Sequence, residues 1–188
     1  MPLAGPSPKK GKPDRVIIGY WRTRALGQAI RVMLAHMGIP FEDRQYQVGD
    51  PPTFDKKVWK EAKLQLEKNG LEFPNLPYLI DTDGTALSQT RTIMRYLATS
   101  RPEHMLMGKN VKQQIQADLV SEVTQEMLDQ FCRMTYSNWL EFPVKRVEFI
   151  SNILPGYLAR FDRECSSIFI ASTKLGRLCW PVGHPLCS

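Results

Sequence analysis

Residues 76–87 read LPYLIDTDGTAL and predict a β-hairpin. The first strand is expected at 76–81, where aromatic and β-branched residues favour a strand, and Asp83-Gly84 is a typical hairpin turn into Thr85-Ala86-Leu87. Pro77 donates no hydrogen bond and is awkward inside a sheet ladder. A cis peptide bond at Leu76-Pro77 turns this liability into an exposed loop end with free backbone groups, so we predict the cis isomer.

A strand, a helix and a second strand are expected before the hairpin. Val16-Ile17-Ile18-Gly19 is a short apolar run with β-branched residues, which predicts a buried strand. Residues 26–37 carry apolar side chains at helical spacing, and Gly38 and Pro40 end that pattern. Residues 41–48 predict a second strand, which we expect near a sheet edge because it carries many charges.

Two further helices complete this part of the chain. Residues 59–67 predict a short surface helix, and residues 88–98 predict a helix with Ile93 and Leu97 on one face. The order strand–helix–strand followed by hairpin–helix implies a small four-stranded mixed sheet with helices on its faces. We therefore predict an α/β thioredoxin-like N-terminal domain over residues 15–101.

The pattern becomes purely helical beyond residue 103. Residues 111–139 form one long helical pattern, and residues 144–161 form another that is interrupted at Pro155-Gly156. Glu141-Phe142-Pro143 separates the two. We therefore expect a second, all-α C-terminal domain.

The predicted all-α domain covers residues 108–164, and the two ends of the chain differ from both domains. Residues 165–188 show no amphipathic period and combine cysteine, tryptophan, glycine and proline, so we expect a divergent tail there. Residues 1–14 are rich in proline, glycine and lysine and have no apolar segment of their own. This composition predicts a flexible extension and not a signal peptide.

Composition narrows the class of protein. The hydrophobic fraction of 43% and the aromatic fraction of 10% are typical of a soluble globular chain. No apolar run approaches the roughly 18 residues of a membrane-spanning helix, so we expect no membrane association. Much of the net charge of +6 lies in the first fifteen residues and on scattered helix faces. Without a basic stripe with interleaved aromatics, we expect no nucleic-acid partner.

The cysteines indicate a reducing compartment. Cys132, Cys165, Cys179 and Cys187 form no CxxC pair and have no metal-ligand spacing. The absence of CxxC makes a thioredoxin-like disulfide enzyme a weak alternative. We therefore expect a cytoplasmic protein with no metal site.

Several motifs follow one another at near-constant spacing, and together they resemble the mu class of glutathione transferases. The resemblance is dense from residue 16 to about residue 97, moderate to about residue 161, and absent afterwards. Its motifs are Tyr20-Trp21 with Arg24-Ala25-Leu26, YQVGDPP at 46–52, FPNLPYLID at 73–81, and SQT at 88–90 with IMRYL at 93–97.

The resemblance implies a transferase that conjugates the glutathione thiolate to hydrophobic electrophiles in detoxification, with glutathione as co-substrate and no other cofactor. A free thiol titrates near 8.5 and is therefore mostly unreactive at pH 7. A hydroxyl that donates to the sulfur stabilises the thiolate, and a pKa lowered by roughly two units corresponds to about 2.7 kcal/mol. Tyr20 matches the tyrosine of the family that does this. Taken alone, Tyr20 is better interpreted as a packed aromatic at a strand end, and only the surrounding motifs favour the catalytic role.

The resemblance also implies a set of glutathione-binding residues. Backbone groups beside Pro77 pair with the cysteinyl portion as a strand would. Gln89 and Thr90 begin a helix, whose free amides and dipole favour the γ-glutamyl carboxylate. Lys63 supplies a charge for the glycyl carboxylate. The full set comprises Tyr20, Trp21, Lys56, Trp59, Lys63, Asn75, Leu76, Gln89, Thr90 and Glu126.

Three further residues match family positions outside the glutathione site. Tyr136 matches the tyrosine that faces the second substrate, and the acceptor is expected between the loop near Val48 and Tyr136. Phe73 matches the aromatic residue that inserts into the neighbouring subunit, and Arg95 matches an arginine at the twofold interface. Both imply a homodimer.

The sequence also departs from the family. Lys56 replaces an arginine and loses its bidentate fork. Glu126 replaces an aspartate that reaches the glutathione amine across the dimer, and Arg91 replaces an asparagine. Because residues 165–188 do not match, the C-terminal helices of the family look incomplete. The alternative function is therefore a catalytically weak, glutathione transferase-like protein that binds ligands or partners.

Overall fold

The computed structural model describes the backbone of residues 12–174 and the side chains of residues 12–164. The predicted extension at 1–14 lies largely outside the described residues, and so does the predicted tail beyond residue 174. The chain divides into two units, one ending at Gln113 and the other beginning at Gln114. No helix within residues 12–174 is long and apolar enough to cross a membrane.

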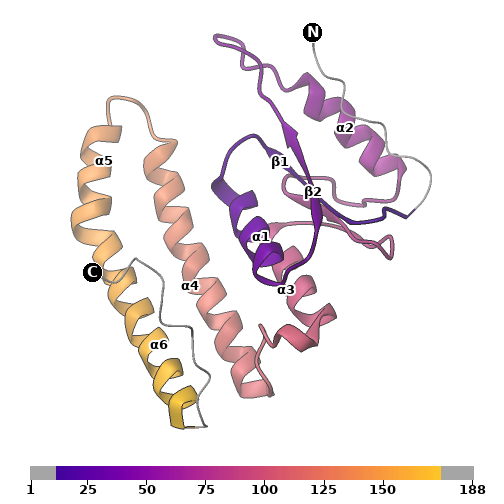
Figure 1. Cartoon of the computed structure of the whole chain (residues 1–188). Coiled ribbons are helices and arrows are strands. Elements are labelled where there is room, and N and C mark those ends of the chain that lie inside the picture. Colours follow the sequence, from indigo (N-terminus) through magenta and orange to yellow (C-terminus); the bar gives the residue numbers. More distant parts are fainter. Residues whose placement is uncertain (1–11, 175–188) are drawn as a thin grey trace. The chain divides into compact units, whose positions relative to one another are not determined.

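The first unit has the predicted four-stranded mixed sheet (Figure 1). Strand β1 pairs in parallel with β2 and antiparallel with β3, and β3 pairs antiparallel with β4. The strand order β2-β1-β3-β4 confirms the expected edge position of the charged second strand. The elements are β1 (Val16–Trp21), α1 (Ala25–His36), β2 (Phe41–Tyr46), α2 (Lys57–Lys68), β3 (Tyr78–Ile80), β4 (Ala86–Ser88), α3 (Thr90–Ser100) and the single-turn helix η1 (Pro102–His104).

The hairpin differs from its prediction only at its ends. Strand β3 begins at Tyr78, so Pro77 lies just before the ladder, where its missing N–H leaves no gap in the pairing. The peptide bond between Leu76 and Pro77 is cis, as predicted, and the bond between Pro51 and Pro52 is also cis. Ser88 was expected to begin a helix, but it ends β4, because it pairs with Tyr78.

Alternating side chains of β1 divide the core between the two faces of the sheet. Val16 and Ile18 pack on one face against α1 and α3, in a cluster that includes Ile30 and Ile93. Ile17 packs on the other face against α2, in a cluster whose members are Leu66, Leu71 and Tyr78 with Tyr46, Trp59 and Leu76 at its margin. Two helices therefore cover one face and α2 covers the other, as Figure 1 shows.

A buried ion pair ties the hairpin to the end of α3. Asp81 is only 3% exposed. It accepts hydrogen bonds from Nη2 of Arg101 at 2.7 and 3.0 Å and from the hydroxyl of Tyr96 at 2.9 Å. Burial alone raises the pKa of Asp81, but the hydrogen bonds from Arg101, the Thr82 backbone and Tyr96 outweigh it and hold that pKa below its ordinary value.

The second unit is helical, and its breaks differ from the predicted ones. Helix α4 (Val111–Thr135) is followed by α5 (Phe142–Glu148), the π-helical turn η2 (Phe149–Ile153) and α6 (Leu154–Lys174). Pro143 was expected in a separator, but it lies at the start of α5, where its missing N–H has no helical partner to lose.

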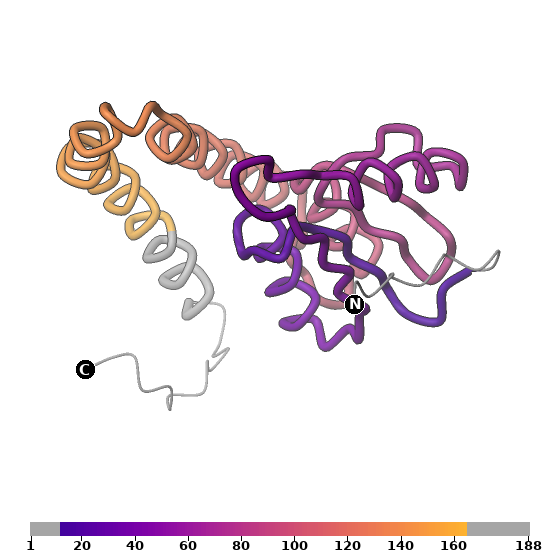
Figure 2. The backbone as a smooth tube through the Cα atoms, turned by 90° about the horizontal axis from the view of Figure 1, so that it is seen from above, coloured from indigo at the N-terminus to yellow at the C-terminus, as the bar shows by residue number. Residues whose placement is uncertain are grey.

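The predicted interruption at Pro155-Gly156 is wrong. Figure 2 shows that α5, η2 and α6 follow one another without a loop. The π turn explains how the helix accommodates the proline, because the N–H of Leu154 bonds five residues back to the carbonyl of Phe149. Pro155 follows directly as the second residue of α6, and the changed hydrogen-bond pattern of the π turn lets the helix pass through a residue that has no N–H to donate. Helix α6 also continues to Lys174, ten residues past residue 164, where the predicted all-α domain was expected to end.

Few side chains of the second unit are buried. Among those described beyond residue 113, only Met134 and Phe149 of the hydrophobic side chains are buried. The ring of Phe149 packs edge-on against Phe131 with centroids 5.8 Å apart. At the other end of α4, Gln116 donates to Glu164 at 2.8 Å. Both contacts join α4 to the helices that follow it.

We predict that Arg101→Met lowers the free energy of unfolding by about 3 kcal/mol at neutral pH, because it leaves the Asp81 carboxylate buried without its cation. Urea denaturation measures this loss. Because the folded pKa of Asp81 is depressed, the pair stabilises the protein above the ordinary carboxyl pKa of about 4 and loses this effect as the pH falls through the folded value. The difference between the two proteins therefore shrinks in acid.

The matched control is Arg15→Met, because Arg15 pairs with Asp14 on the surface, where ion pairs contribute little. Equal losses for the two variants, or a difference that does not change with pH, would contradict the role assigned to Asp81.

Candidate functional site

The sheet register brings the predicted glutathione residues to one end of the first unit. Gly19 of β1 pairs with Tyr78 of β3, and Tyr78 pairs with Ser88 of β4. One step further along each strand are Tyr20, Pro77 and Gln89, so these residues lie in a row across the end of the sheet. On the other side of β1, Trp21 pairs with Tyr46, the last residue of β2.

Tyr20 lies at the end of β1 on the face that α1 covers. It is 6% exposed, so its ring is part of the core. A Cβ atom on Gly27 would lie 2.6 Å from a ring carbon of Tyr20, which is closer than carbon atoms approach in proteins. Only glycine therefore fits at residue 27, and the backbone of α1 holds the tyrosine ring in place. A rigid ring suits a hydroxyl that must meet a sulfur at a fixed position.

The N-terminus of α3 follows Gln89. No side chain caps this helix, so its first backbone amides have no partner from a capping residue. Gln89 has a φ of 72°, a conformation that costs free energy for any residue but glycine. The backbone amides at the helix start and the positive end of the helix dipole make this a suitable site for a carboxylate.

The two predicted lysines lie at the start of α2 and near its middle. Lys56 directly precedes the helix, and Lys63 comes one turn after Trp59 and therefore shares its face. Both lysine side chains are exposed. Solvated ammonium groups on one helix face can bind a second carboxylate, so both lysines stay candidates for the glycyl end.

Asn75 and Leu76 lie in the loop before β3. The side chain of Asn75 is exposed, and its Oδ1 accepts a hydrogen bond of 2.9 Å from the N–H of Leu76. This local bond shapes the turn that leads to the cis peptide. Leu76 is partly buried and packs against the same core cluster as Trp59.

The structure does not bring every predicted site residue into this unit. Glu126 lies exposed on α4, and Tyr136, which follows α4, is 86% exposed; both belong to the second unit. Phe73 is 71% exposed, and Arg95 is exposed on α3. Exposure of a large aromatic side chain such as Phe73 is consistent with an interface, and the dimer role of both residues stays a prediction.

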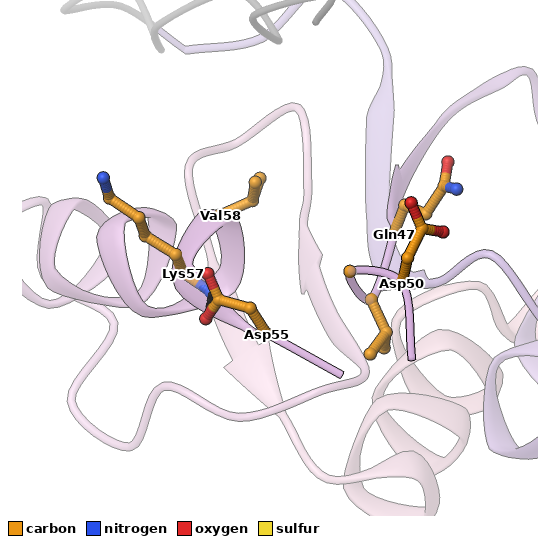
Figure 3. A pocket seen from close by; sticks show the side chains of 7 residues that line it. Gln47, Asp50, Asp55, Lys57 and Val58 are labelled. Atoms are coloured by element: carbon orange, nitrogen blue, oxygen red, sulfur yellow. Dashed lines mark hydrogen bonds between the residues drawn. The ribbon is translucent and has the colours of Figure 1, made fainter. Parts of the chain in front are cut away.

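An open pocket lies between the end of β2 and the start of α2. Its volume is about 210 Å³. Figure 3 shows Gln47 and Asp50 on one side, with Asp55, Lys57 and Val58 on the other. Pockets that enclose drug-sized ligands usually exceed about 300 Å³, so this pocket alone is too small to enclose a hydrophobic acceptor. The N–H of Gly49 donates to the carbonyl of Asp55 at 2.7 Å and closes the base of the loop.

Two tyrosines that support the site were not among the residues predicted for it. Tyr46 and Tyr78 join through their hydroxyl oxygens at 2.8 Å, and both rings contact Trp59. The signal that could have found them is Gly19, because an isolated glycine inside a strand often marks the close approach of another group. A Cβ on Gly19 would overlap the Tyr78 ring. Among the residues that the structure describes, no group of three or more metal-ligating side chains occurs.

Residues 17–99 match the family model "Glutathione S-transferase, N-terminal domain". The chain is 34% identical over 169 residues to glutathione S-transferase Mu 4 of Mus musculus, a match covering 90% of this chain and 68% of the relative. It is 35% identical over 172 residues to glutathione S-transferase Mu 1 of Bos taurus, covering 91% of this chain and 69% of the relative. The chain thus spans about two thirds of the length of these relatives.

Solved structures give the same fold. A Pi-class glutathione S-transferase of Onchocerca volvulus superposes with a TM-score of 0.62 at 27% identity, covering 79% of this chain and 62% of that one. Prostaglandin synthase D of Nilaparvata lugens superposes with a TM-score of 0.64 at 19% identity, covering 81% and 69%. At that identity the second likeness supports the fold alone.

We predict that Gly19→Ala destabilises the protein by about 1–3 kcal/mol, because the new methyl group collides with the Tyr78 ring. Thermal and urea unfolding measure this change. Gly156→Ala is the control of opposite sign: nothing lies within 4 Å of a Cβ there, and alanine favours a helix over glycine by up to about 1 kcal/mol. A Gly19→Ala protein as stable as the parent would mean that the Tyr78 ring is not fixed against β1.

Proposed function

Because this chain belongs to the mu class of the glutathione S-transferase family, we propose that it conjugates the thiolate of glutathione to hydrophobic electrophiles. The observation that carries this proposal is the row formed by Tyr20, the cis bond before Pro77, and the uncapped start of α3 after Gln89. This row offers a hydroxyl for a sulfur, backbone groups for a peptide, and amides for a carboxylate.

Tyr20 activates the sulfur in this proposal. Its hydroxyl donates a hydrogen bond to the glutathione sulfur and favours the thiolate over the thiol, which makes the sulfur nucleophilic at neutral pH. The thiolate then attacks an electrophilic carbon and forms a carbon–sulfur bond. Glutathione is consumed as a co-substrate, and the reaction needs no metal or prosthetic group.

The tripeptide is held at both ends by positive charge. Its γ-glutamyl carboxylate lies at the start of α3 near Gln89 and Thr90, and its glycyl carboxylate meets Lys56 and Lys63. Trp21, Trp59, Asn75 and Leu76 complete the binding surface. Glu126 from a second copy reaches the amino group, and Tyr136 faces the acceptor.

The working form in this proposal is a cytoplasmic homodimer. Phe73 is the exposed aromatic residue that a second copy would cover, and Arg95 accompanies it at the interface. Cys132 is a free, exposed thiol, which suits a reducing compartment.

We predict that Tyr20→Phe lowers kcat at neutral pH by about 25-fold, because loss of the hydroxyl returns the thiol pKa by roughly two units to its free value near 8.5, where only about 3% of the thiol is ionised at pH 7. Conjugation of a chloronitroaromatic acceptor measures kcat, and retention on immobilised glutathione measures binding, which should survive.

Tyr157→Phe is the matched control, because Tyr157 lies on α6, outside the first unit, and the control should leave kcat unchanged. Equal loss of turnover and of retention in Tyr20→Phe would contradict the activating role of Tyr20.

We predict that Phe73→Ala shifts the protein from dimer toward monomer, because it removes the large apolar side chain that the second copy would bury. Analytical ultracentrifugation over a range of concentrations measures the dissociation constant, which should rise at least 10-fold. Phe54→Ala is the control, since Phe54 is a similarly exposed phenylalanine outside the proposed interface. A monomeric parent, or a Phe73→Ala dimer as stable as the parent, would contradict the interface.

A further inference from the structure

Two tyrosine side chains meet across the central strand of the sheet. Tyr46 ends β2 and Tyr78 begins β3, and these strands do not pair with each other because β1 lies between them. Their hydroxyl oxygens are nevertheless 2.8 Å apart. Gly19 makes this possible, because the Tyr78 ring occupies the space where any other residue of β1 would carry its Cβ.

The joined tyrosines form the surface on which Trp59 rests. The indole ring lies nearly parallel to the Tyr78 ring, with an interplanar angle of 16° and centroids 6.4 Å apart. It meets the Tyr46 ring edge-on at 5.3 Å. Trp59 is therefore oriented by both rings, and their hydrogen bond fixes the angle between its two supports.

Trp59 in turn holds the first half of α2. Among the residues of α2, only Leu66 is fully buried, and it lies two turns after Trp59. The partly buried indole is thus the main contact that anchors the beginning of the helix to the sheet. Lys56 and Lys63 flank Trp59 along the chain, so their positions depend on the same contact.

Burial makes the hydrogen bond between Tyr46 and Tyr78 costly to lose. Tyr78 is completely buried, and burial raises its pKa well above the ordinary value, so the hydroxyl stays neutral at physiological pH. Burial also raises the pKa of Tyr46. The Tyr46 hydroxyl has Tyr78 as its hydrogen-bond partner, whereas the Tyr78 hydroxyl also interacts with the guanidinium of Arg44. Removing the Tyr78 hydroxyl therefore takes away the hydrogen-bond partner of Tyr46, and removing the Tyr46 hydroxyl leaves Tyr78 with Arg44 alone.

We propose that Tyr46 and Tyr78 are positioning residues. Their hydrogen-bonded hydroxyls set the affinity for glutathione through Trp59 and the start of α2. The inference rests on the proposed function, in which Trp59 and the two lysines bind the tripeptide. The pair lies on the face that α2 covers, whereas Tyr20 lies on the opposite face against α1. The α2 face of the sheet therefore governs the affinity for glutathione, whereas Tyr20 on the opposite face governs the ionisation of the glutathione thiol.

The test compares Tyr46→Phe, Tyr78→Phe and the double variant, which keep the rings and remove only hydroxyl groups. The KM for glutathione should rise about 5-fold in each single variant, as expected for one hydrogen bond. The double variant should match Tyr78→Phe, because Tyr78→Phe alone already removes both the shared bond and the interaction of Tyr78 with Arg44. The kcat at saturating glutathione and the pH dependence of kcat should not change.

Tyr96→Phe is the matched control. It removes a hydroxyl of the same unit that donates to Asp81 at 2.9 Å. This bond joins α3 to the hairpin and does not involve α2. This variant should lose stability without a change in KM. An equal rise of KM in Tyr96→Phe, additive effects in the double variant, or a fall of kcat in step with the rise of KM would overturn the positioning role.

Amide hydrogen exchange separates this inference from the proposed function. Protection of the α2 amides should fall in Tyr46→Phe and remain at the parent level in Tyr96→Phe. A parent protein that does not bind glutathione would overturn the proposed function and the affinity claim together. Unchanged protection of α2 in Tyr46→Phe would overturn the positioning of the helix, whatever the protein binds.

Discussion

The contact between the Tyr78 ring and the backbone of Gly19 is the constraint on which the first unit depends. This contact requires a glycine in the middle of β1. It lets β3 approach in the register that places Tyr20, Pro77 and Gln89 in one row. It also fixes the Tyr78 ring against which Trp59 stacks. A single close approach between two strands thus sets both the geometry of the sheet end and the position of α2. The chemistry proposed for Tyr20 requires the same register, because a hydroxyl can select the thiolate only if the peptide is held at a fixed distance from it.

The two units are stabilised to different degrees by burial. The first unit has a buried cluster on each face of its sheet and a buried ion pair at Asp81. In the second, two hydrophobic side chains are buried among those described, while apolar residues such as Ile115, Val144 and Leu158 are exposed. Each buried large apolar side chain contributes about 1.5–3 kcal/mol, so most of the apolar burial that stabilises the described chain lies in the first unit.

Local patterns in the sequence predicted the first unit well because its elements follow short-range rules. The apolar run at Val16, the Asp83-Gly84 turn and the charged second strand each identified an element and its place in the sheet. Gly19 signals that some group approaches β1 closely, but it does not predict the Tyr46–Tyr78 bond, which joins residues on strands that do not pair. The course of the helix through Pro155 was also missed, because a π turn leaves no periodic signal in the residues that form it.

The most direct test of the central claim is the ionisation of glutathione in its complex with the protein, followed by the ultraviolet absorbance of the thiolate as the pH is varied. The account predicts that the bound thiol titrates roughly two units below its free value near 8.5, and that Tyr20→Phe abolishes the shift. A bound thiol that remains protonated at neutral pH in the parent protein would contradict it.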